Sequence, residues 1–408
     1  MARKGAKGAK LTGRAARKVR SYDERFAGIV HLLVSSPAPS ISSSQNNSLK
    51  IFTIVGARPQ FVKAAVLSRA FAACDSAEEY IIHSGQHYDA NMSEVFFEEM
   101  HIRAPYRNLE VNGGSHGAMT GRMLEKLDAL FRAEQPDWVV VFGDTNTTLA
   151  AALAAKKLGI QVAHIEAGVR SGDAFMPEEI NRMIVDRIAT LNFCCTKLGV
   201  ENLRKEGSEY GIGYEVYNYG DVMYDAALYY KDIAAAWSGI ISSLQLESKA
   251  YVLATIHRES NVDNDHQLKS LIEGLNRIAR EIPVVFPTHP RTRQRIKELA
   301  LPQKVDLIEP VGYFDMLQLI RHAKLVVTDS GGVVREAYFF KKPSIFLLDR
   351  HVWPELEEAG ASRSVEVRAP GVLYDLYVEM RTQRVPGGRQ IFGEGNAGEK
   401  IAERIASW

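Results

Sequence analysis

The chain has 408 residues, of which 46% are hydrophobic and 24% charged, and this is the balance of a globular protein large enough for two cores. Its formal net charge of +1 gives no field that would attract nucleic acid or an anionic membrane, so we expect neither as a partner. Three cysteines, two of them adjacent, exclude a disulfide framework, and no run of 18 apolar residues occurs, so we expect a cytoplasmic location.

Residues 1–48 differ in composition from the rest of the chain. The first 20 residues hold eight Lys or Arg and no acid, and residues 35–48 are mostly Ser, Pro, Asn and Gln. Such a segment buries too little apolar surface to offset the entropy lost on ordering, so we exclude it from the fold. Three interpretations stay open: a disordered basic tail, a translation-start artefact and a transit-type peptide.

From residue 50 onward, short β-branched runs alternate with helical patterns, which predicts parallel sheets covered by helices. A first set of strands is predicted at Lys50–Val55, Glu79–His83, Trp138–Phe142 and Gln161–Ile165. A helix opened by Pro59 follows the first of these strands, and another helix is predicted over Leu149–Leu158. A second set is predicted at Ala250–Ile256, Pro283–Pro287, Val305–Ile308, Leu325–Thr328 and Ser344–Leu348.

This pattern predicts two doubly wound domains that face a cleft. We place the boundary just after Gly220-Asp221-Val222, which gives domains over 49–222 and 223–390, and expect a final helix within 391–408 that packs on either domain. Ligands of open α/β sheets bind at the carboxyl ends of the strands, so the cleft is the expected site. The sequence contains no glycine-rich dinucleotide fingerprint.

Polar residues follow the strand ends on both sides of this cleft. After the first strand, Gly56 leads into a helix N-terminus with Arg58 and Lys63, where free backbone N–H groups would bind an anion. The alternative is an ordinary turn with a surface Arg and Lys. Asp144 follows a buried strand, and its carboxylate would enter the crevice or, alternatively, cap the next helix.

Two further acidic motifs follow in the same half. His164 and Glu166 share one face of a strand, where an acid is costly unless it is paired or exposed. Pro177 opens a helix with Glu178 and Glu179 in its first turn. Glu178, Arg182 and Asp186 are spaced four apart, so a capped, salt-bridged helix is the alternative to a site.

The second half carries a nucleotide-type motif. The segment Thr328–Glu336 is a strand end, a glycine turn and a helix, in which Ser330, Gly331 and Gly332 let backbone amides approach a diphosphate. Glu336 lies about a turn into the helix, where it can accept hydrogen bonds from ribose hydroxyls. His257 also follows a strand, and a structural histidine is its alternative interpretation.

Together these motifs resemble the non-hydrolysing UDP-N-acetylglucosamine 2-epimerases, in order and from about residue 50 to 360. The matching stretches are Gly-Ala-Arg-Pro-Gln-Phe-Val-Lys (56–63), Ser-Gly-Gln-His-Tyr-Asp (84–89), Gly-Asp-Thr-Asn-Thr-Thr (143–148), His-Ile-Glu-Ala-Gly-Val-Arg (164–170), Pro-Glu-Glu-Ile-Asn-Arg (177–182) and Thr-Asp-Ser-Gly-Gly (328–332) with Glu336. The subtype resembles that of surface-polysaccharide gene clusters, some members of which use UDP-2,3-diacetamido-2,3-dideoxyglucuronate.

The resemblance implies a GT-B fold and a reaction without metal or cofactor. UDP leaves by anti elimination to a 2-acetamidoglycal and is re-added after a proton returns to the other face of C2. By resemblance, Asp144, Glu166 and Glu178 are the acid–base carboxylates and His257 is the essential histidine. The substrate-binding positions implied are Arg58, Lys63, Arg182, Arg258, Ser330, Gly331, Gly332 and Glu336.

The resemblance also implies a homodimer and a second UDP-sugar bound as activator near Gln86, His87 and Arg122. The chain departs from the family pattern at residues 348–355, where an Arg and a Thr-Glu pair are missing, and in the segment before Pro177, which is two residues shorter. Three alternatives stay open: a hydrolysing 2-epimerase that releases UDP and a free N-acetylmannosamine-type sugar, a GT-B glycosyltransferase, and an inactive UDP-sugar sensor.

Overall fold

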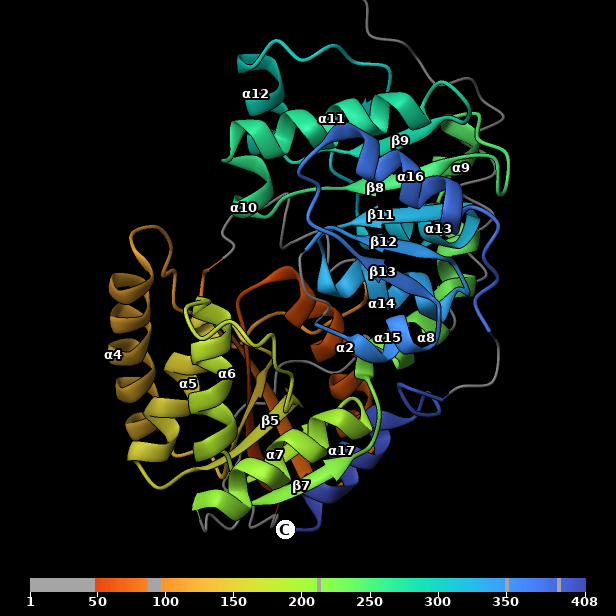
Figure 1. Cartoon of the computed structure of the whole chain (residues 1–408). Helices are drawn as coiled ribbons and strands as arrows, with labels where there is room; N and C mark the ends of the chain where they lie inside the picture. Colours follow the sequence, from red (N-terminus) through yellow and green to blue (C-terminus); the bar gives the residue numbers. More distant parts are fainter. Residues whose placement is uncertain (1–47, 87–96, 98, 211–213, 349–351, 387–389) are drawn as a thin grey trace, which may run out of the picture. The chain divides into compact units, whose positions relative to one another are not determined.

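The computed structural model describes residues 48–408 apart from 87–96, 98, 211–213, 349–351 and 387–389. The extension over 1–48 therefore falls almost wholly outside the described residues, as do His87 and residues 349–351 of the divergent segment. The described chain contains two parallel sheets, each with helices on both faces (Figure 1).

The N-terminal sheet has the strand order β3-β2-β1-β4-β5-β6-β7. Its strands are β1 (Leu49–Val55), β2 (Ala77–His83), β3 (Arg107–Asn108), β4 (Trp138–Phe142), β5 (Gln161–Ala167), β6 (Leu191–Cys194) and β7 (Glu215–Asn218). Its helices are α2 (Arg58–Ala72), α4 (His116–Glu134), α5 (Asn146–Lys157), α6 (Pro177–Ile188) and α7 (Lys197–Tyr210). The chain order reverses between β1 and β4, which makes this the switch point of the sheet.

The C-terminal sheet repeats this winding with the order β10-β9-β8-β11-β12-β13. Its strands are β8 (Val252–Thr255), β9 (Val284–Pro287), β10 (Asp306–Ile308), β11 (Leu325–Thr328), β12 (Ser344–Phe346) and β13 (Ser362–Ser364). The remaining helices are α8 (Val222–Trp237), α9 (Ile240–Ser243), α10 (Glu259–Val262), α11 (Asp265–Ile278), α12 (Pro290–Glu298), α13 (Tyr313–His322), α14 (Gly331–Phe339), α15 (Pro354–Glu358), α16 (Pro370–Met380) and α17 (Ala397–Ala406). The switch point lies between β8 and β11.

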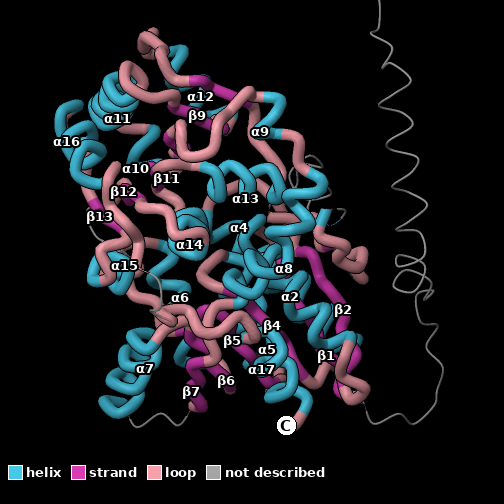
Figure 2. Tube along the Cα trace, turned by 90° about the vertical axis from the view of Figure 1, so that its right-hand side faces the viewer, coloured by secondary structure: helices cyan, strands magenta, loops and turns pink. Residues whose placement is uncertain are grey.

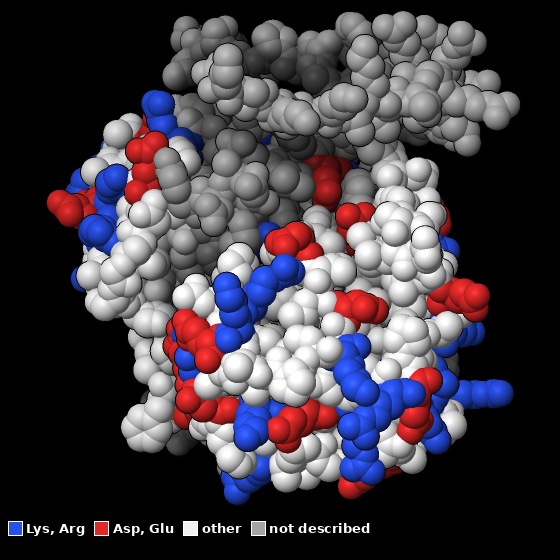
Figure 3. Space-filling view, turned by 90° about the horizontal axis from the view of Figure 1, so that it is seen from above, with Lys and Arg blue, Asp and Glu red and all other residues white. Residues whose placement is uncertain are grey.

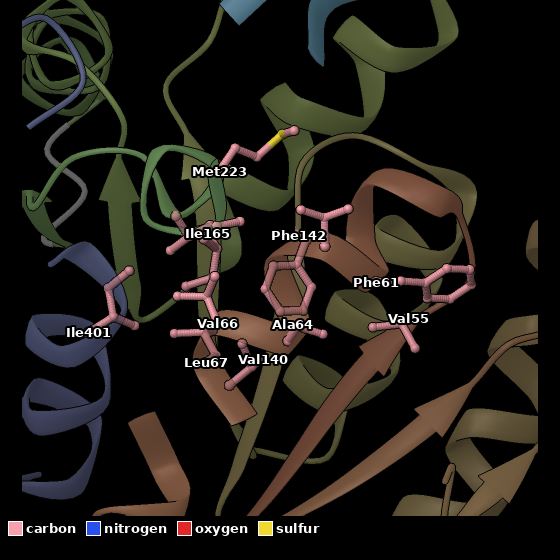
Figure 4. Packing of buried hydrophobic residues seen from close by; sticks show 14 of the residues in the cluster. Val55, Phe61, Ala64, Val66, Leu67, Val140, Phe142, Ile165, Met223 and Ile401 are labelled. Carbon is pink, nitrogen blue, oxygen red and sulfur yellow. The ribbon is translucent and has the colours of Figure 1, made fainter. Parts of the chain in front are cut away.

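The central strands β1, β4, β5, β8 and β11 bury side chains on both faces, as expected of a parallel sheet. In the N-terminal sheet, alternate residues of β1 and β4 divide between two cores. Ile51 and Val140 pack towards α2, α8 and α17, whereas Phe52 and Val139 pack towards α4, α5 and α6. Figure 4 shows the first of these cores, with Ile401 of α17 turned towards the cluster of α2 and the strands.

The final helix packs on the N-terminal core. Its backbone is tied to α8 by a hydrogen bond of 2.8 Å from the N–H of Gly398 to the Asp225 carboxylate, and Trp408 lies edge-on to Trp138 with ring centroids 5.4 Å apart. The tube in Figure 2 shows α17 beside the strands of this sheet. The position of α17, which the sequence left open, is thus settled, while the domain limits themselves stay a prediction.

The described residues show no single-sign surface on the face in view and no membrane-spanning helix. Basic and acidic side chains are interspersed on the face seen in Figure 3, so no single-sign patch dominates that face. Across the described ranges, no helix is long and apolar enough to cross a membrane.

Candidate active site

The two switch points open onto one cavity of about 620 Å³. Its walls come from the residues after β1, β4 and β5, the start of α6, the residues after β8 and β9, and the turn between β11 and α14. Nearly all of the predicted site residues within the described part of the chain line it: Arg58, Lys63, Gln86, Asp144, Glu166, Glu178, Arg182, His257, Arg258, Ser330, Gly331, Gly332 and Glu336. Motifs spread over 280 residues therefore converge, as the rule for strand ends predicts.

The turn after β1 differs from the predicted anion site. The N–H groups of Gly56 and Ala57 both donate to the side-chain oxygen of Gln60, over 2.8 and 3.0 Å. The amide nitrogen of Gln60 in turn donates to the carbonyl of Phe142 at the end of β4. The prediction of free N–H groups here was wrong for these two residues, because a side chain of α2 satisfies them. Arg58 still lines the cavity, and burial lowers its pKa.

A buried ion network lies at the base of the cavity. The Glu166 carboxylate lies 2.8 Å from Nζ of Lys63 and 2.6 Å from Nη1 of Arg335, and the same Arg335 nitrogen lies 2.6 Å from the Asp221 carboxylate. All four side chains are at most 11% exposed. Lys63 lies on α2 and Glu166 on β5, whereas Arg335 lies on α14, so the network joins the two halves of the site.

The environment of Glu166 fixes its charge. Burial by itself would raise the pKa of Glu166, but the positive charges of Arg335 and Lys63 outweigh burial and lower this pKa to about 2. Glu166 also has a backbone φ of +70°, a left-handed conformation that costs a non-glycine residue energy, and the register of β5 against β6 shifts at this point. Glu166 therefore combines a strained backbone with a carboxylate that takes part in the network.

The same region contains three groups with metal-ligand chemistry, Glu166, Cys195 and Asp221. Both carboxylates already bond to Arg335, and burial raises the pKa of the Cys195 thiol well above its usual range. A cation-bridged pair of acids and a protonated thiol fit an ion network better than they fit a metal ion.

Asp144 faces the cavity and does not cap the helix that follows it. The N-cap of α5 is Thr145, whose hydroxyl accepts the N–H of Thr148, so the capping alternative was wrong. The Asp144 carboxylate instead forms an ion pair with Arg182 of α6, and Arg182 also bonds to Glu179 over 3.0 Å. Arg182 thus sets the position of Asp144 at the cavity wall.

The pairing predicted along α6 was wrong. Arg182 pairs with Asp144 and Glu179 rather than with Glu178 and Asp186. Asp186 bonds to His164, Nδ1 to Oδ1 over 2.7 Å, and to Arg170. Glu178 is half-buried on the cavity wall, and its carboxylate has no hydrogen-bond or ion-pair partner among the described residues. The carboxylate of Glu178 is therefore available to a ligand.

His257 lies on the opposite wall, at the end of β8. Its Nδ1 is 2.8 Å from Oδ1 of Asp329, a completely buried residue at the end of the neighbouring strand β11. The Asp329 carboxylate also accepts the backbone N–H groups of His257 and Arg258, and the Arg258 guanidinium donates to the carbonyl of Asp329. The histidine side chain is 53% exposed, so it is not the buried structural histidine of the alternative interpretation.

The N-terminus of α14 keeps the free donors that α2 lacks. Ser330 is the N-cap, and its hydroxyl accepts the N–H of Val333. Among the described residues, the N–H groups of Gly331 and Gly332 have no acceptor, and both glycines line the cavity. A Cβ atom added at Gly331 would meet its nearest atoms at 3.6 Å, in ordinary contact, so the fold itself does not require a glycine there. Free donors at a helix N-terminus bind anions.

Glu336 follows at the second turn of α14. Burial, despite the opposing charge of Arg335, raises the pKa of Glu336 to about 8, so this acid carries a proton at neutral pH. Tyr313, at the start of α13, lies within hydrogen-bond reach of Glu336 and also lines the cavity. A protonated carboxyl can both donate to and accept from a pair of hydroxyl groups.

The predicted activator residues separate in the structure. Gln86 lines the cavity and accepts a hydrogen bond of 2.8 Å from the Thr147 hydroxyl. Arg122 lies outside the cavity wall, on the exposed side of α4, where its guanidinium donates to the carbonyls of Asn112 and Gly113.

In the divergent segment, Val352 and Trp353 line the cavity, and the Trp353 ring covers Arg335 with its centroid 4.4 Å from the guanidinium carbon.

Comparison with known proteins shows what kind of site this is. The model of a family described as UDP-N-acetylglucosamine 2-epimerase matches residues 69–406. The chain belongs to the UDP-N-acetylglucosamine 2-epimerase family. It is 45% identical over 363 residues to the UDP-2,3-diacetamido-2,3-dideoxy-D-glucuronate 2-epimerase of Pseudomonas aeruginosa, which covers 88% of this chain and 99% of the relative.

A second relative adds a solved structure. The chain is 39% identical to the UDP-N-acetylglucosamine 2-epimerase of Methanocaldococcus jannaschii, over 86% of this chain and 98% of the relative. The crystal structure of that epimerase with UDP-GlcNAc and UDP superposes with a TM-score of 0.82 at 38% identity, covering 88% of this chain and all of the other. The GT-B fold and the family inferred from the motifs are therefore confirmed.

Sequence reasoning about the epimerase motifs missed three residues that organise the site. Asp329 and Arg335 both lie inside the Thr328–Glu336 segment, and Asp221 lies in the boundary motif, yet none was assigned a role. Each acts through a partner from another element: Asp329 through His257, Arg335 through Glu166, and Asp221 through Arg335. One feature of the sequence could have found these residues: each is a charged side chain near a strand end or a helix start. A charge that is buried there requires a counter-charge from elsewhere in the chain.

Proposed function

We propose that the protein inverts C2 of a UDP-linked 2-acetamido sugar in this cavity. The observation that carries the proposal is the pairing of two features across one cavity: a carboxylate-bearing wall, and a helix N-terminus with free N–H donors. The first suits proton transfer at carbon, and the second suits a diphosphate. Relatives that act on UDP-sugars, and a relative's structure that contains UDP-GlcNAc and UDP, support the same interpretation.

In this proposal the UDP half binds at α14. The diphosphate accepts hydrogen bonds from the N–H groups of Gly331 and Gly332 with help from the Ser330 hydroxyl, and the helix dipole favours its charge. Glu336 holds the ribose hydroxyls. Arg58 and Arg258 line the same cavity and add positive charge near the bond that breaks.

The chemical half begins when a base removes the proton from C2 as the C1–O bond breaks. The C2–H electron pair becomes the C1–C2 double bond of the glycal, and UDP leaves with the C1–O electrons. A proton is then delivered to the opposite face of C2, and the diphosphate oxygen reattacks C1. We assign the two proton transfers to Glu178, which has no partner among the described residues, and to Asp144, which Arg182 holds in place.

Glu166 has a different role in this scheme. Because its pKa is about 2, it is a weak base that stays ionised at neutral pH, so it serves to hold Lys63 and Arg335 at the base of the cavity. His257 faces the cavity from the C-terminal sheet, and we assign to its Nε2 the role of an acceptor for a hydroxyl group of the UDP-sugar in the transition state. These assignments keep all four predicted catalytic residues in the site while dividing their tasks.

The experiment offers two substrates, UDP-GlcNAc and UDP-2,3-diacetamido-2,3-dideoxyglucuronate, in deuterated buffer and follows the H1 and H2 NMR signals. We expect inversion with deuterium incorporation at C2 and no free UDP in proportion to turnover. Release of UDP and free sugar would replace the proposal with the hydrolysing reaction, and inversion without deuterium at C2 would exclude elimination. Transfer of the sugar to an added acceptor would indicate a glycosyltransferase.

Two substitutions separate catalysis from binding alone. Glu178→Gln and Asp144→Asn should each lower kcat at least 100-fold and change the Kd for UDP by less than about threefold, since each removes one proton-transfer group. Glu201→Gln, in the first turns of α7 and outside the cavity wall, is the matched control and should leave kcat unchanged. A parent protein that binds UDP-sugars without turnover would instead be a sensor.

The remaining expectations on partners are proposals as well. We propose a homodimer, supported by an exposed apolar group on and before α6: Phe175 (93% exposed), Ile180 (44%), Met183 (45%) and Ile184 (36%). We also propose that a second UDP-sugar binds near Gln86 and acts as an activator. The guanidinium of Arg122 is engaged by carbonyls of the loop before α4, so we do not propose Arg122 as the main contact of this activator. A sigmoidal dependence of rate on substrate would support the activator, and a hyperbolic one would oppose it.

A further inference from the structure

The described part of the chain contains two aspartate–histidine pairs, each with a buried aspartate, that differ in one respect. In the first, His164 bonds to Asp186 through Nδ1 and to the carbonyl of Gly143 through Nε2, both over 2.7 Å, so both ring nitrogens are occupied and the ring is wholly buried. In the second, His257 bonds to Asp329 through Nδ1 only. Its Nε2 has no partner among the described residues, and the ring lines the cavity.

The surroundings of Asp329 require it to be an acceptor. Its carboxylate receives two backbone N–H groups, from His257 and Arg258, and the amide of Asn261. Burial would raise its pKa, yet the contact with His257 and these hydrogen bonds outweigh burial and lower it. An ionised carboxylate has no proton to donate, so the hydrogen between Asp329 and His257 belongs to Nδ1 of the histidine.

We infer that Asp329 is a positioning residue that fixes His257 as the Nδ1–H tautomer, with the Nε2 lone pair presented to the sugar-nucleotide. A histidine acts as acceptor only through the nitrogen without hydrogen, so the partner on one ring nitrogen decides what the other can do. The inference rests on the proposed function for its catalytic consequence, but the tautomer itself is a property of the unliganded protein.

The two carboxylate oxygens of Asp329 are not equivalent, and this makes a sharp test available. Oδ2 receives three donors, namely the N–H groups of His257 and Arg258 and the side chain of Asn261. Oδ1 receives Nδ1 of His257 and a longer contact of 3.2 Å from its backbone N–H. In Asp329→Asn, the amide oxygen takes the Oδ2 position with its three donors. The amide NH₂ then faces Nδ1 of His257.

A donor facing Nδ1 forces the hydrogen of the ring onto Nε2. Asp329→Asn should therefore preserve the shape of the site and reverse the tautomer of His257. The Nε2 that faces the substrate becomes a donor in place of an acceptor, which is the wrong state for the reaction. An aspartate-to-asparagine change beside a catalytic histidine is known to act in this way in serine proteases.

The experiment uses the full-length protein labelled with ¹⁵N-histidine, and long-range ¹H–¹⁵N spectra that distinguish the two tautomers. The His257 signals are assigned by their loss in His257→Gln. We expect the parent to show hydrogen on Nδ1, and Asp329→Asn to show it on Nε2. We further expect kcat to fall at least 100-fold, with KM and the Kd for UDP changed less than about threefold.

The control is Asp225→Asn, which also alters a buried aspartate that accepts a backbone N–H, that of Gly398, but lies outside the cavity wall. It should leave the His257 tautomer and kcat unchanged. A parent protein with hydrogen on Nε2 of His257 would overturn the inference without any variant. So would an Asp329→Asn protein whose tautomer reverses while kcat stays within threefold of the parent. If the tautomers behave as expected but the parent has no epimerase activity, the positioning stands and the proposed function fails.

Discussion

The buried ion network gives the most demanding prediction, which concerns Arg335→Met. Arg335 neutralises two carboxylates at once, with 2.6 Å from one nitrogen to Glu166 and 2.6 Å to Asp221, and the ion-paired side chains are almost fully buried. Removing one partner of such a network leaves uncompensated buried charge, which costs about 3 to 5 kcal/mol. Lys63 stays beside Glu166, but among the described residues it forms no ion pair with Asp221.

The lowered pKa of Glu166 gives a second value for the free energy of unfolding that Arg335→Met should cost. The folded state lowers this pKa to about 2 from the value of 4.5 for a free glutamate. A shift of this size corresponds to about 3 kcal/mol of stability, which agrees with the mutational range. Because the pKa is lowered, this stability is fully present above pH 4.5 and is lost as the pH falls through 2. The parent–variant difference should therefore narrow between pH 7 and pH 3, by up to about 2 kcal/mol, because Lys63 stays beside Glu166 and keeps part of the shift.

The assay is urea unfolding of both proteins, followed by tryptophan fluorescence, at pH 7 and at pH 3. Trp353 stacks on Arg335 and makes the signal sensitive to the region. Arg132→Met is the control, because Arg132 pairs with Asp128 on the surface of α4 and its loss should cost less than about 1 kcal/mol. A loss below 1 kcal/mol for Arg335→Met at pH 7, or a difference that grows as the pH falls, would refute the reasoning.

Three further predictions follow from the site and the surface. Gly331→Ala should raise the KM for the UDP-sugar at least tenfold without lowering the melting temperature, because the added methyl fits the fold but covers the free N–H donors; Gly371→Ala in the first turn of α16 is the matched control and should leave KM unchanged. Glu336→Gln should be more stable than the parent by roughly 4 kcal/mol at pH 8 and equal to it near pH 4 in urea unfolding. The sign follows because the pKa of Glu336 is raised to about 8, so the parent loses stability as the pH rises from 4.5 through 8. Ile180→Glu, on the exposed apolar face of α6, should convert the proposed dimer to a monomer in sedimentation velocity, and a variant that sediments as the parent does would contradict an interface on this face.

The sequence predicted the strands at the switch points well and missed four short strands. The strands at the switch points, β1, β4, β8 and β11, lie within two residues of their predicted limits. β3, β6, β7 and β13 were not predicted. These are short, and β7 and β13 are polar, with the sequences Glu-Val-Tyr-Asn and Ser-Arg-Ser. A strand of this kind forms because a neighbouring strand offers hydrogen bonds, and that information lies outside the strand's own sequence.

The same distinction holds for the site. The sequence predicted which residues line the cavity, because strand ends of a parallel sheet meet at one edge. It did not predict their pairings. The four-residue spacing of Glu178, Arg182 and Asp186 is real, but Arg182 turns to Asp144 from the β4 end, and Asp186 turns to His164 on β5. Spacing along a helix gives candidates for ion pairs, and tertiary burial selects among them.

The pairings explain how one cavity holds several acids with different properties. Glu166, between two cations, has a pKa of about 2, whereas Glu336, buried with Asp221 nearby, has a pKa of about 8. Arg335 touches Glu166 and is the residue next to Glu336, so one side chain of α14 contributes to both values. Because nucleotide binding is proposed at this helix and proton transfer on the opposite wall, any movement of α14 that displaces Arg335 would raise the pKa of Glu166. The charge of Glu166 at the base of the cavity thus depends on the position of α14, the helix at which UDP binding is proposed.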